Sequence, residues 1–195
     1  MTIHLALLWR EIVLVMLAAA VAGHAVAQDL PSGTVANRIV VEKGRSSSDG
    51  ASQQMTPKEE CEALMNALVP FAEQMLSKHR EFYPFGGTMS VDGKIAQSAS
   101  YTGEEHPPSQ RLIDLLEKGF RDGAKRHLYK ATAIVIDVRT IPPGKKEKQD
   151  AVEVRLDHVS GYSVKMLFPY AFSPKGNLEF APPFAALGDG RIFGR

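Results

Sequence analysis

The single cysteine, Cys61, is the side chain best able to act as a nucleophile. It falls in the first turn of a predicted helix, and a helix N-terminus lowers the pKa of a nearby thiol, which would favour the reactive thiolate. The apolar spacing of that helix, however, places Cys61 on the inward face. A buried free cysteine usually acts as a small hydrophobic residue. We therefore predict that Cys61 has a packing role and no catalytic one.

The histidines give no stronger indication of a reaction centre. Glu104, Glu105 and His106 carry metal-binding groups, but adjacent loop residues do not converge on an ion as residues one helical turn apart do. His158 has the apolar parity of its predicted strand, which is typical of a half-buried ring with one nitrogen bonded to the backbone. The chain has no phosphate-binding loop, nucleophile elbow or helical zinc motif. The sequence predicts no catalytic residue, metal site or cofactor.

Charged side chains alternate with apolar ones along three predicted strands. This alternation predicts one buried and one solvated sheet face. The residues assigned to the solvated face are Asp137, Arg139, Glu153, Arg155, Asp157 and Lys165. Such a face is a candidate docking surface, because its charge pattern would select a partner and set the association rate. The alternative interpretation is that these charges only keep the sheet soluble.

Two helices and five strands are predicted to position these residues. The first helix begins in the run 56–59 (TPKE), where a hydroxyl, a proline and a carboxylate are suited to the free amides of a helix start. Its apolar residues recur with helical spacing as far as Leu76. A hairpin is predicted over 85–100, and a second helix begins near Ser109. Three alternating strands follow at 131–141, 151–158 and 162–168.

The predicted element order is α-β-β-α-β-β-β, an α+β fold in two layers. Two helices suffice to cover the apolar face of a five-stranded antiparallel sheet, so both are expected on that one face. The aromatic–proline runs 83–85 and 168–170 would meet if the first and last strands paired, which gives the spatial order 2-1-5-4-3. Roadblock-type and profilin-like domains have the same element order, a likeness of fold alone. Residues 171–195 are predicted as an irregular strap on this single domain, 55–195.

Residues 1–27 have the features of a signal peptide. An apolar run at 12–22 is short for a membrane span and follows Arg10, and the small residues at 25–27 form a cleavage pattern. We expect cleavage after Ala27 and a periplasmic or secreted protein with no stable membrane anchor; an uncleaved anchor is the alternative. Residues 28–54 have the composition of a flexible linker.

The overall composition narrows the class of protein. Of the 195 residues, 44% are hydrophobic and 23% are charged, proportions that fit one globular domain and exclude a collagen-like, disordered or polytopic membrane protein. The 23 basic and 22 acidic residues leave a net charge of +1. Such a balance provides no broad field to attract nucleic acid. One cysteine excludes an internal disulfide framework.

Several short motifs resemble those of a family of small uncharacterised bacterial α+β domains. They are EFYPFG at 81–86, DAV at 150–152, LDH at 156–158, GY at 161–162 and FPY at 168–170. The resemblance covers about residues 57–195 and implies a stand-alone domain with no assigned catalytic residue. Some members of the family resemble the immunity proteins of polymorphic toxin systems, so the resemblance also implies a protein partner.

These observations favour an exported, non-enzymatic protein-binding domain, with an immunity-like protein as its most concrete form. One alternative is a small periplasmic enzyme whose site is assembled from the dispersed residues Cys61, His106, Asp157 and His158. Another is an accessory or scaffold protein of the envelope. A pocket that holds two or more of those side chains with strongly shifted pKa values would favour the enzyme, whereas a flat charged sheet with no such pocket would favour binding. Neither the partner nor the oligomeric state follows from the sequence.

Overall fold

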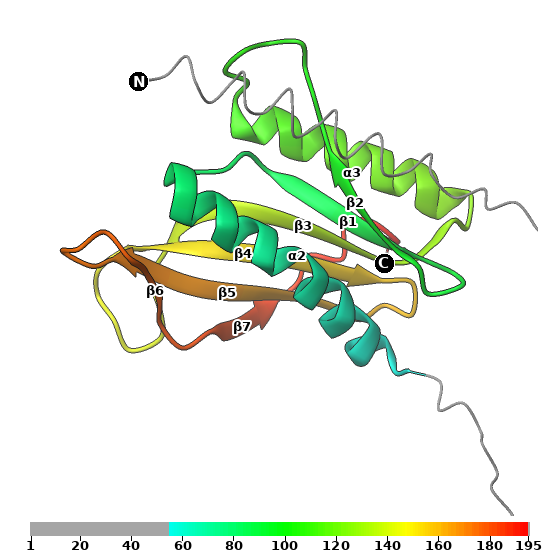
Figure 1. Cartoon of the computed structure of the whole chain (residues 1–195). Coiled ribbons are helices and arrows are strands. Elements are labelled where there is room, and N and C mark those ends of the chain that lie inside the picture. Colours follow the sequence, from blue (N-terminus) through cyan, green and yellow to red (C-terminus); the bar gives the residue numbers. More distant parts are fainter. Residues whose placement is uncertain (1–54, 195) are drawn as a thin grey trace, which may run out of the picture.

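The computed structural model describes residues 55–194, which form two helices and seven strands (Figure 1). The helices are α2 (Pro57–His79) and α3 (Ser109–Lys125). The strands are β1 (Phe85–Ser90), β2 (Ile95–Ala99), β3 (Tyr129–Thr140), β4 (Gln149–His158), β5 (Ser163–Phe172), β6 (Leu178–Phe180) and β7 (Phe184–Leu187). The predicted α+β class is confirmed. The predicted signal peptide, 1–27, and linker, 28–54, lie outside the described residues.

The strands form an antiparallel sheet in the order β2-β1-β3-β4-β5, and both β6 and β7 pair with β5. The predicted order 2-1-5-4-3 and the count of five strands are wrong. β1 pairs with β3, where Phe85 lies opposite Val135, so the two aromatic–proline runs do not lie on neighbouring strands. The reason is that residues 131–136 of β3 are buried on both faces, and a strand of that kind belongs in the middle of a sheet.

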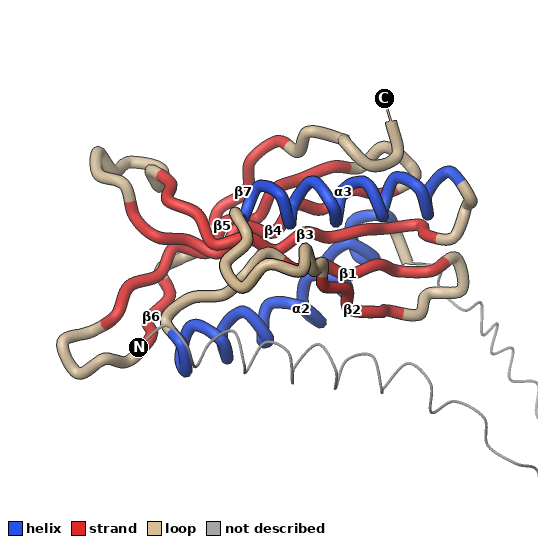
Figure 2. Tube along the Cα trace, turned by 90° about the horizontal axis from the view of Figure 1, so that it is seen from above, coloured by secondary structure: helices blue, strands red, loops and turns tan. Residues whose placement is uncertain are grey.

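The helices cover opposite faces of the sheet (Figure 2), so the prediction that both lie on one face is wrong. α2 packs on the face that carries Val135, and α3 packs on the face that carries Ile134 and Ile136. Alternate residues of a strand point to opposite faces. The sequence pattern of β3 predicts apolar residues against charged ones, yet its alanines at 131 and 133 add a second apolar row. The domain therefore has three layers and two cores.

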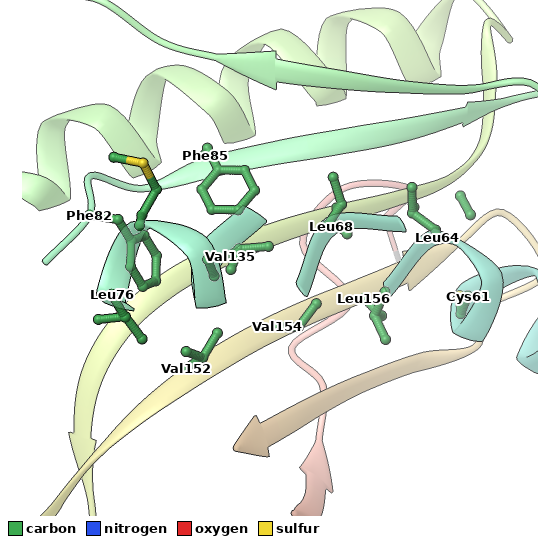
Figure 3. Close-up of a cluster of buried hydrophobic side chains, with 14 of the residues drawn as sticks. Cys61, Leu64, Leu68, Leu76, Phe82, Phe85, Val135, Val152, Val154 and Leu156 are labelled. Atoms are coloured by element: carbon green, nitrogen blue, oxygen red, sulfur yellow. The ribbon is translucent and has the colours of Figure 1, made fainter. Parts of the chain in front are cut away.

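The larger core lies between α2 and the sheet (Figure 3). Leu64 and Leu68 of α2 belong to one buried cluster with Val154 and Leu156 of β4. The predicted helix start is confirmed by a capping box, in which the Thr56 hydroxyl accepts from the Glu59 N–H and the Glu59 carboxylate accepts from the Thr56 N–H. α2 continues as one helix through the proline at position 70.

Two adjacent glycines in β1 allow both helices to approach the sheet closely. A Cβ atom at Gly87 would lie 2.9 Å from the Leu68 side chain of α2. On the other face, a Cβ atom at Gly86 would lie 2.9 Å from the Phe120 ring of α3 and 2.5 Å from a backbone oxygen of β3. Each glycine therefore accommodates one helix, because consecutive strand residues face opposite ways.

The C-terminal segment completes both the sheet and the second core. β6 and β7 run back along β5, and Pro182 and Pro183 separate them. Proline is suited to this position at a sheet edge, because it has no N–H to donate. Ile192 is buried with Ile134 and Ile136 under α3. The predicted strap thus includes regular strands. No helix within residues 55–194 has the length and apolar character needed to cross a membrane.

Candidate functional site

The six residues predicted to form one docking face are divided between the two faces of the sheet. Four of them lie on the face toward α3: Glu153, Arg155, Asp157 and Lys165. Asp137 and Arg139 lie on the opposite face. The register explains the division, since Arg155 is opposite Ile134 whereas Asp137 is opposite Val152. A register shift of one residue exchanges the faces of every side chain, and the sequence pattern alone did not determine the register.

Three of the charges on the α3 face are used in ion pairs that connect separate elements. The Arg155 guanidinium lies 2.6 Å from the Glu153 carboxylate and 3.9 Å from that of Glu117 on α3. Lys165 contacts Asp189 of the C-terminal segment at 2.8 Å, and Arg191 reaches Glu117 at 3.5 Å. The Glu117 side chain is only 8% exposed, and Arg121, Arg155 and Arg191 together balance its buried charge. The cluster ties α3 and the C-terminal segment to the sheet.

The fourth residue on this face, Asp157, organises the chain around the β4–β5 turn. Its carboxylate accepts a hydrogen bond from the Ser163 hydroxyl at 2.5 Å, and the Ser163 oxygen accepts from the Gly190 N–H at 3.0 Å. A cavity of about 20 Å³ lies beside this cluster. That volume accommodates about one water molecule. The geometry therefore shows a structural junction on this face.

The two predicted residues on the α2 face also have partners within the domain. The Asp137 carboxylate accepts a hydrogen bond from the Tyr170 hydroxyl at 2.9 Å. Burial raises the pKa of Asp137, although the hydrogen bond from Tyr170 acts in the opposite direction. Arg139 lies 3.2 Å from Asp150, and both side chains are well exposed. These two residues lie at the end of the sheet that is distant from the β4–β5 turn.

A buried hydrogen-bonded group at the start of α2 was not predicted from the sequence. The Glu60 carboxylate contacts the Lys130 ammonium at 2.6 Å and the Nε2 atom of His158 at 2.8 Å. The Nδ1 atom of His158 accepts from the Ser160 N–H at 3.0 Å and lies 2.8 Å from the Ser160 hydroxyl. Nε2 therefore carries the proton and donates it toward Glu60. The signal in the sequence was a carboxylate on the inward face of an amphipathic helix.

The row Ser160–His158–Glu60 has the residue types of a hydrolytic triad, but its surroundings are those of a turn. An acyl-transfer site needs unoccupied N–H groups aimed at a developing oxyanion. The Val159 N–H donates to the Lys130 carbonyl, the Gly161 N–H to the His158 carbonyl, and the Ser160 N–H to His158 itself. The amides nearest the Ser160 hydroxyl are therefore all occupied. The group joins α2, β3 and the β4–β5 turn.

Cys61 is fully buried among leucines and valines, which confirms its predicted place on the inward face of the helix. Burial raises the pKa of its thiol to about 12, and the carboxylates of Asp157 and Glu60 act in the same direction. The thiolate needed for nucleophilic attack is therefore strongly disfavoured.

Of the four residues of the enzyme alternative, Asp157 and His158 both line a cavity of about 10 Å³ beside the β4–β5 turn, whereas Cys61 and His106 do not line it. His106 bonds to the Tyr83 hydroxyl at 3.3 Å, next to the start of β1, whereas His158 is paired with Ala131 at the other end of β3. Asp157 and His158 are neighbours on β4 and point to opposite faces. Within residues 55–194, no three His, Cys, Asp or Glu side chains are placed to hold a metal ion.

A row of apolar side chains beside α2 is the largest feature that the sequence analysis missed. We define the α2–β5 strip by its partly or fully exposed apolar residues, which are Met65, Val69, Tyr162, Val164, Met166, Phe168 and Leu187. On β5 and β7 these residues share the face toward α2. The Leu187 side chain is 91% exposed.

The orientation of α2 explains why the strip is only partly covered. One flank of the helix contacts β2, because the Gln97 side chain donates to the Ala67 carbonyl. The opposite flank carries Met65 and Val69, one and two turns after Cys61. α2 thus lies over β3 and β4 and leaves β5 beside it (Figure 1).

No family model, curated protein or solved structure matches this chain, so the resemblance to small bacterial α+β domains remains an expectation.

Proposed function

We propose that this chain is an exported, non-enzymatic protein-binding domain that holds its partner on the α2–β5 strip. The observation that carries the proposal is this row of partly buried apolar side chains, which continues from β5 to the exposed Leu187 of β7. Monomeric soluble proteins seldom expose contiguous apolar patches that have no binding role. The proposed partner is another protein with an apolar surface.

The composition of the strip supports protein binding. Interface centres are enriched in aromatic residues and methionine and depleted of charge, and the strip contains Met65, Tyr162, Met166 and Phe168. At its edge lie the paired side chains of Lys58 and Glu62, both well exposed. A polar rim around an apolar centre is the usual anatomy of an interface. In the immunity-like form of the proposal, this preformed surface occludes the active site of a toxin.

The charged residues of the α3 face do not form the proposed interface. Arg155 and Lys165 are occupied by Glu153 and Asp189 within the domain, so a partner would have to displace an existing ion pair to use them. Displacing a partly buried pair costs more than contacting an exposed charge. We therefore place the interface on the α2 side of the sheet.

The test uses the full chain with a C-terminal tag, expressed in its own host and recovered from the envelope. A partner that copurifies stoichiometrically is identified, and its affinity is measured for the unchanged protein, for Met166→Lys and for Val91→Lys. Met166→Lys is expected to weaken binding by about tenfold or more, the effect of losing a central apolar contact. Val91→Lys is the matched control, since Val91 is an exposed apolar residue outside the strip.

Four results would contradict the proposal. The first is a Met166→Lys variant that melts at the temperature of the unchanged protein and binds the partner with unchanged affinity. The second is loss of binding in Lys165→Glu, which would return the interface to the charged α3 face. The third is turnover of a small substrate by the protein alone, and the fourth is the absence of any stoichiometric partner.

A further inference from the structure

β7 is an edge strand whose outer side has no partner among the described residues. It pairs only with β5, where Leu187 lies opposite Val164 and Ala185 lies opposite Met166. The Gly188 N–H donates to the Ser163 carbonyl at 3.3 Å. Because backbone groups alternate in direction along a strand, the N–H and C=O groups of Ala185 and Leu187 point away from β5. These groups are available to another strand.

Within the strand itself, the β7 edge carries no charge and no proline. Residues 184–188 (FAALG) are uncharged, and the guards that edge strands normally carry, proline and charge, only flank them as Pro183 and Asp189. At the opposite edge of the sheet, the exposed Lys94 likewise precedes β2, but the central residue of β2, Gln97, is turned toward α2 by the bond to Ala67. β7 is therefore the better site for an added strand.

The β7 edge is complementary to itself. A two-fold axis normal to the sheet and passing by Ala186 would place each Ala185 opposite the partner's Leu187, so that the outward N–H and C=O groups of both residues are satisfied. The same register places Phe184 opposite the partner's Gly188. Each large side chain then lies across from a small one, and an aromatic residue covering a cross-strand glycine is a known stabilising pair.

We propose that two copies of this chain associate through antiparallel pairing of their β7 strands about Ala186. The pairing extends the sheet across both subunits and places both α2 faces on the same side, so the two α2–β5 strips become neighbours. An edge this short buries less than the roughly 800 Å² per partner of a standard interface. The dimer is therefore expected to be weak and to dissociate on dilution.

The first experiment measures mass by sedimentation of the protein recovered from the host envelope, over about a hundredfold range of concentration. The unchanged protein is expected to change from monomer to dimer as its concentration rises. Leu187→Asp places two carboxylates close to the axis and is expected to weaken association by about tenfold or more. Ile95→Asp is the matched control on the β2 edge and is expected to leave the mass unchanged.

The second experiment tests the register. Residues at 186 form a pair without mutual hydrogen bonds, for which the Cα atoms of an antiparallel ladder approach to about 4.5 Å, within disulfide reach. Ala186→Cys is expected to give an oxidised dimer under native conditions. Ala171→Cys, at an exposed alanine on β5, is expected to form no disulfide-linked dimer, and the native Cys61 is buried.

The proposed dimer would be overturned if the unchanged protein were a monomer at every concentration. It would also be overturned if Ile95→Asp abolished the dimer and Leu187→Asp retained it. Equal cross-linking of Ala171→Cys would overturn the register. The proposed function is judged separately, because Met166→Lys changes the strip and leaves the outward backbone of β7 in place. If Met166→Lys loses partner binding while its mass in sedimentation is unchanged, the result supports the α2–β5 strip as the partner site. If Leu187→Asp sediments with the mass of a monomer, the result supports pairing through the β7 edge.

Discussion

At the scale of single residues, Glu60 has the most consequential environment. Its carboxylate lies in the first turn of α2 and contacts Lys130 of β3 and His158 of β4. Burial alone would raise the pKa of Glu60, but the hydrogen bonds from Lys130 and His158 hold that pKa below its usual value. The folded protein therefore retains this negative charge and uses it to join three elements.

Replacing Glu60 by Gln is expected to destabilise the domain at neutral pH by about 2–4 kcal/mol, since it leaves the partly buried Lys130 ammonium without its counter-charge. Because the folded pKa is lowered, the stabilisation by Glu60 is complete above the unfolded-state pKa of about 4.3 and declines as the pH falls through the folded value. Chemical denaturation measured at neutral and at acidic pH should therefore show that Glu60→Gln loses less stability on acidification than the unchanged protein does. Glu62→Gln, an exposed control, should stay within about 0.5 kcal/mol of the unchanged protein.

The thiol of Cys61 is expected to be unreactive in the native protein. Because burial raises its pKa to about 12, the thiol stays protonated at pH 8. A chromogenic disulfide reagent should label no thiol under native conditions and one thiol per chain in guanidinium. Rapid stoichiometric labelling of the folded protein would show instead that Cys61 is accessible.

At the scale of elements, the two adjacent glycines of β1 set the distance of both helices from the sheet. A side chain at Gly87 would meet Leu68 of α2, and one at Gly86 would meet Phe120 of α3. In a tightly packed core, even one added methyl group forces the neighbouring side chains to move. The three-layer arrangement therefore depends on two positions that carry no side chain.

Gly87→Ala is expected to lower the free energy of unfolding by about 1–3 kcal/mol, the usual cost of overpacking. Gly119→Ala on α3 is the matched control, because a Cβ atom there meets nothing within 4 Å. Alanine has a higher helix propensity than glycine, so Gly119→Ala is expected to raise the free energy of unfolding by up to about 1 kcal/mol. Equal effects of the two substitutions in urea denaturation would contradict the role assigned to Gly87.

At the scale of the whole molecule, the C-terminal segment closes the second core. Ile192 is buried between α3 and the sheet, and Arg191 contacts the buried Glu117. Asp189 in the same segment contacts Lys165 of β5. One short segment therefore supplies both apolar and ionic contacts to the α3 face.

Ile192→Ala is expected to destabilise the domain by about 2–4 kcal/mol, through lost burial and the cavity that remains. The matched control is Ile141→Ala, at an isoleucine that is 51% exposed, and it should change stability by less than about 0.5 kcal/mol. Thermal or urea unfolding of the two variants provides the comparison. A similar effect of both would mean that the C-terminal segment does not contribute to the core.

Local physical chemistry determined the two helices and the first five strands, whereas β6 and β7 were not predicted. The start of α2 followed from Thr56 and Glu59, because a capping box involves only residues within one helical turn. The α+β class followed from the periods of the apolar residues. The burial of Cys61 followed in the same way, since its place on the inward face depends on helical spacing alone.

The tertiary structure alone decided which strand is central and which residues form a site. β3 lies beside β1, and Glu60 meets His158, 98 positions further along the chain; a local pattern does not specify contacts between residues so far apart. The division of the six charged residues between two faces depended on a register that is set by cross-strand packing. The α2–β5 strip arose from the direction in which α2 crosses the sheet. The sequence thus determined the amphipathic elements, and their mutual packing decided which apolar surface remained for a partner.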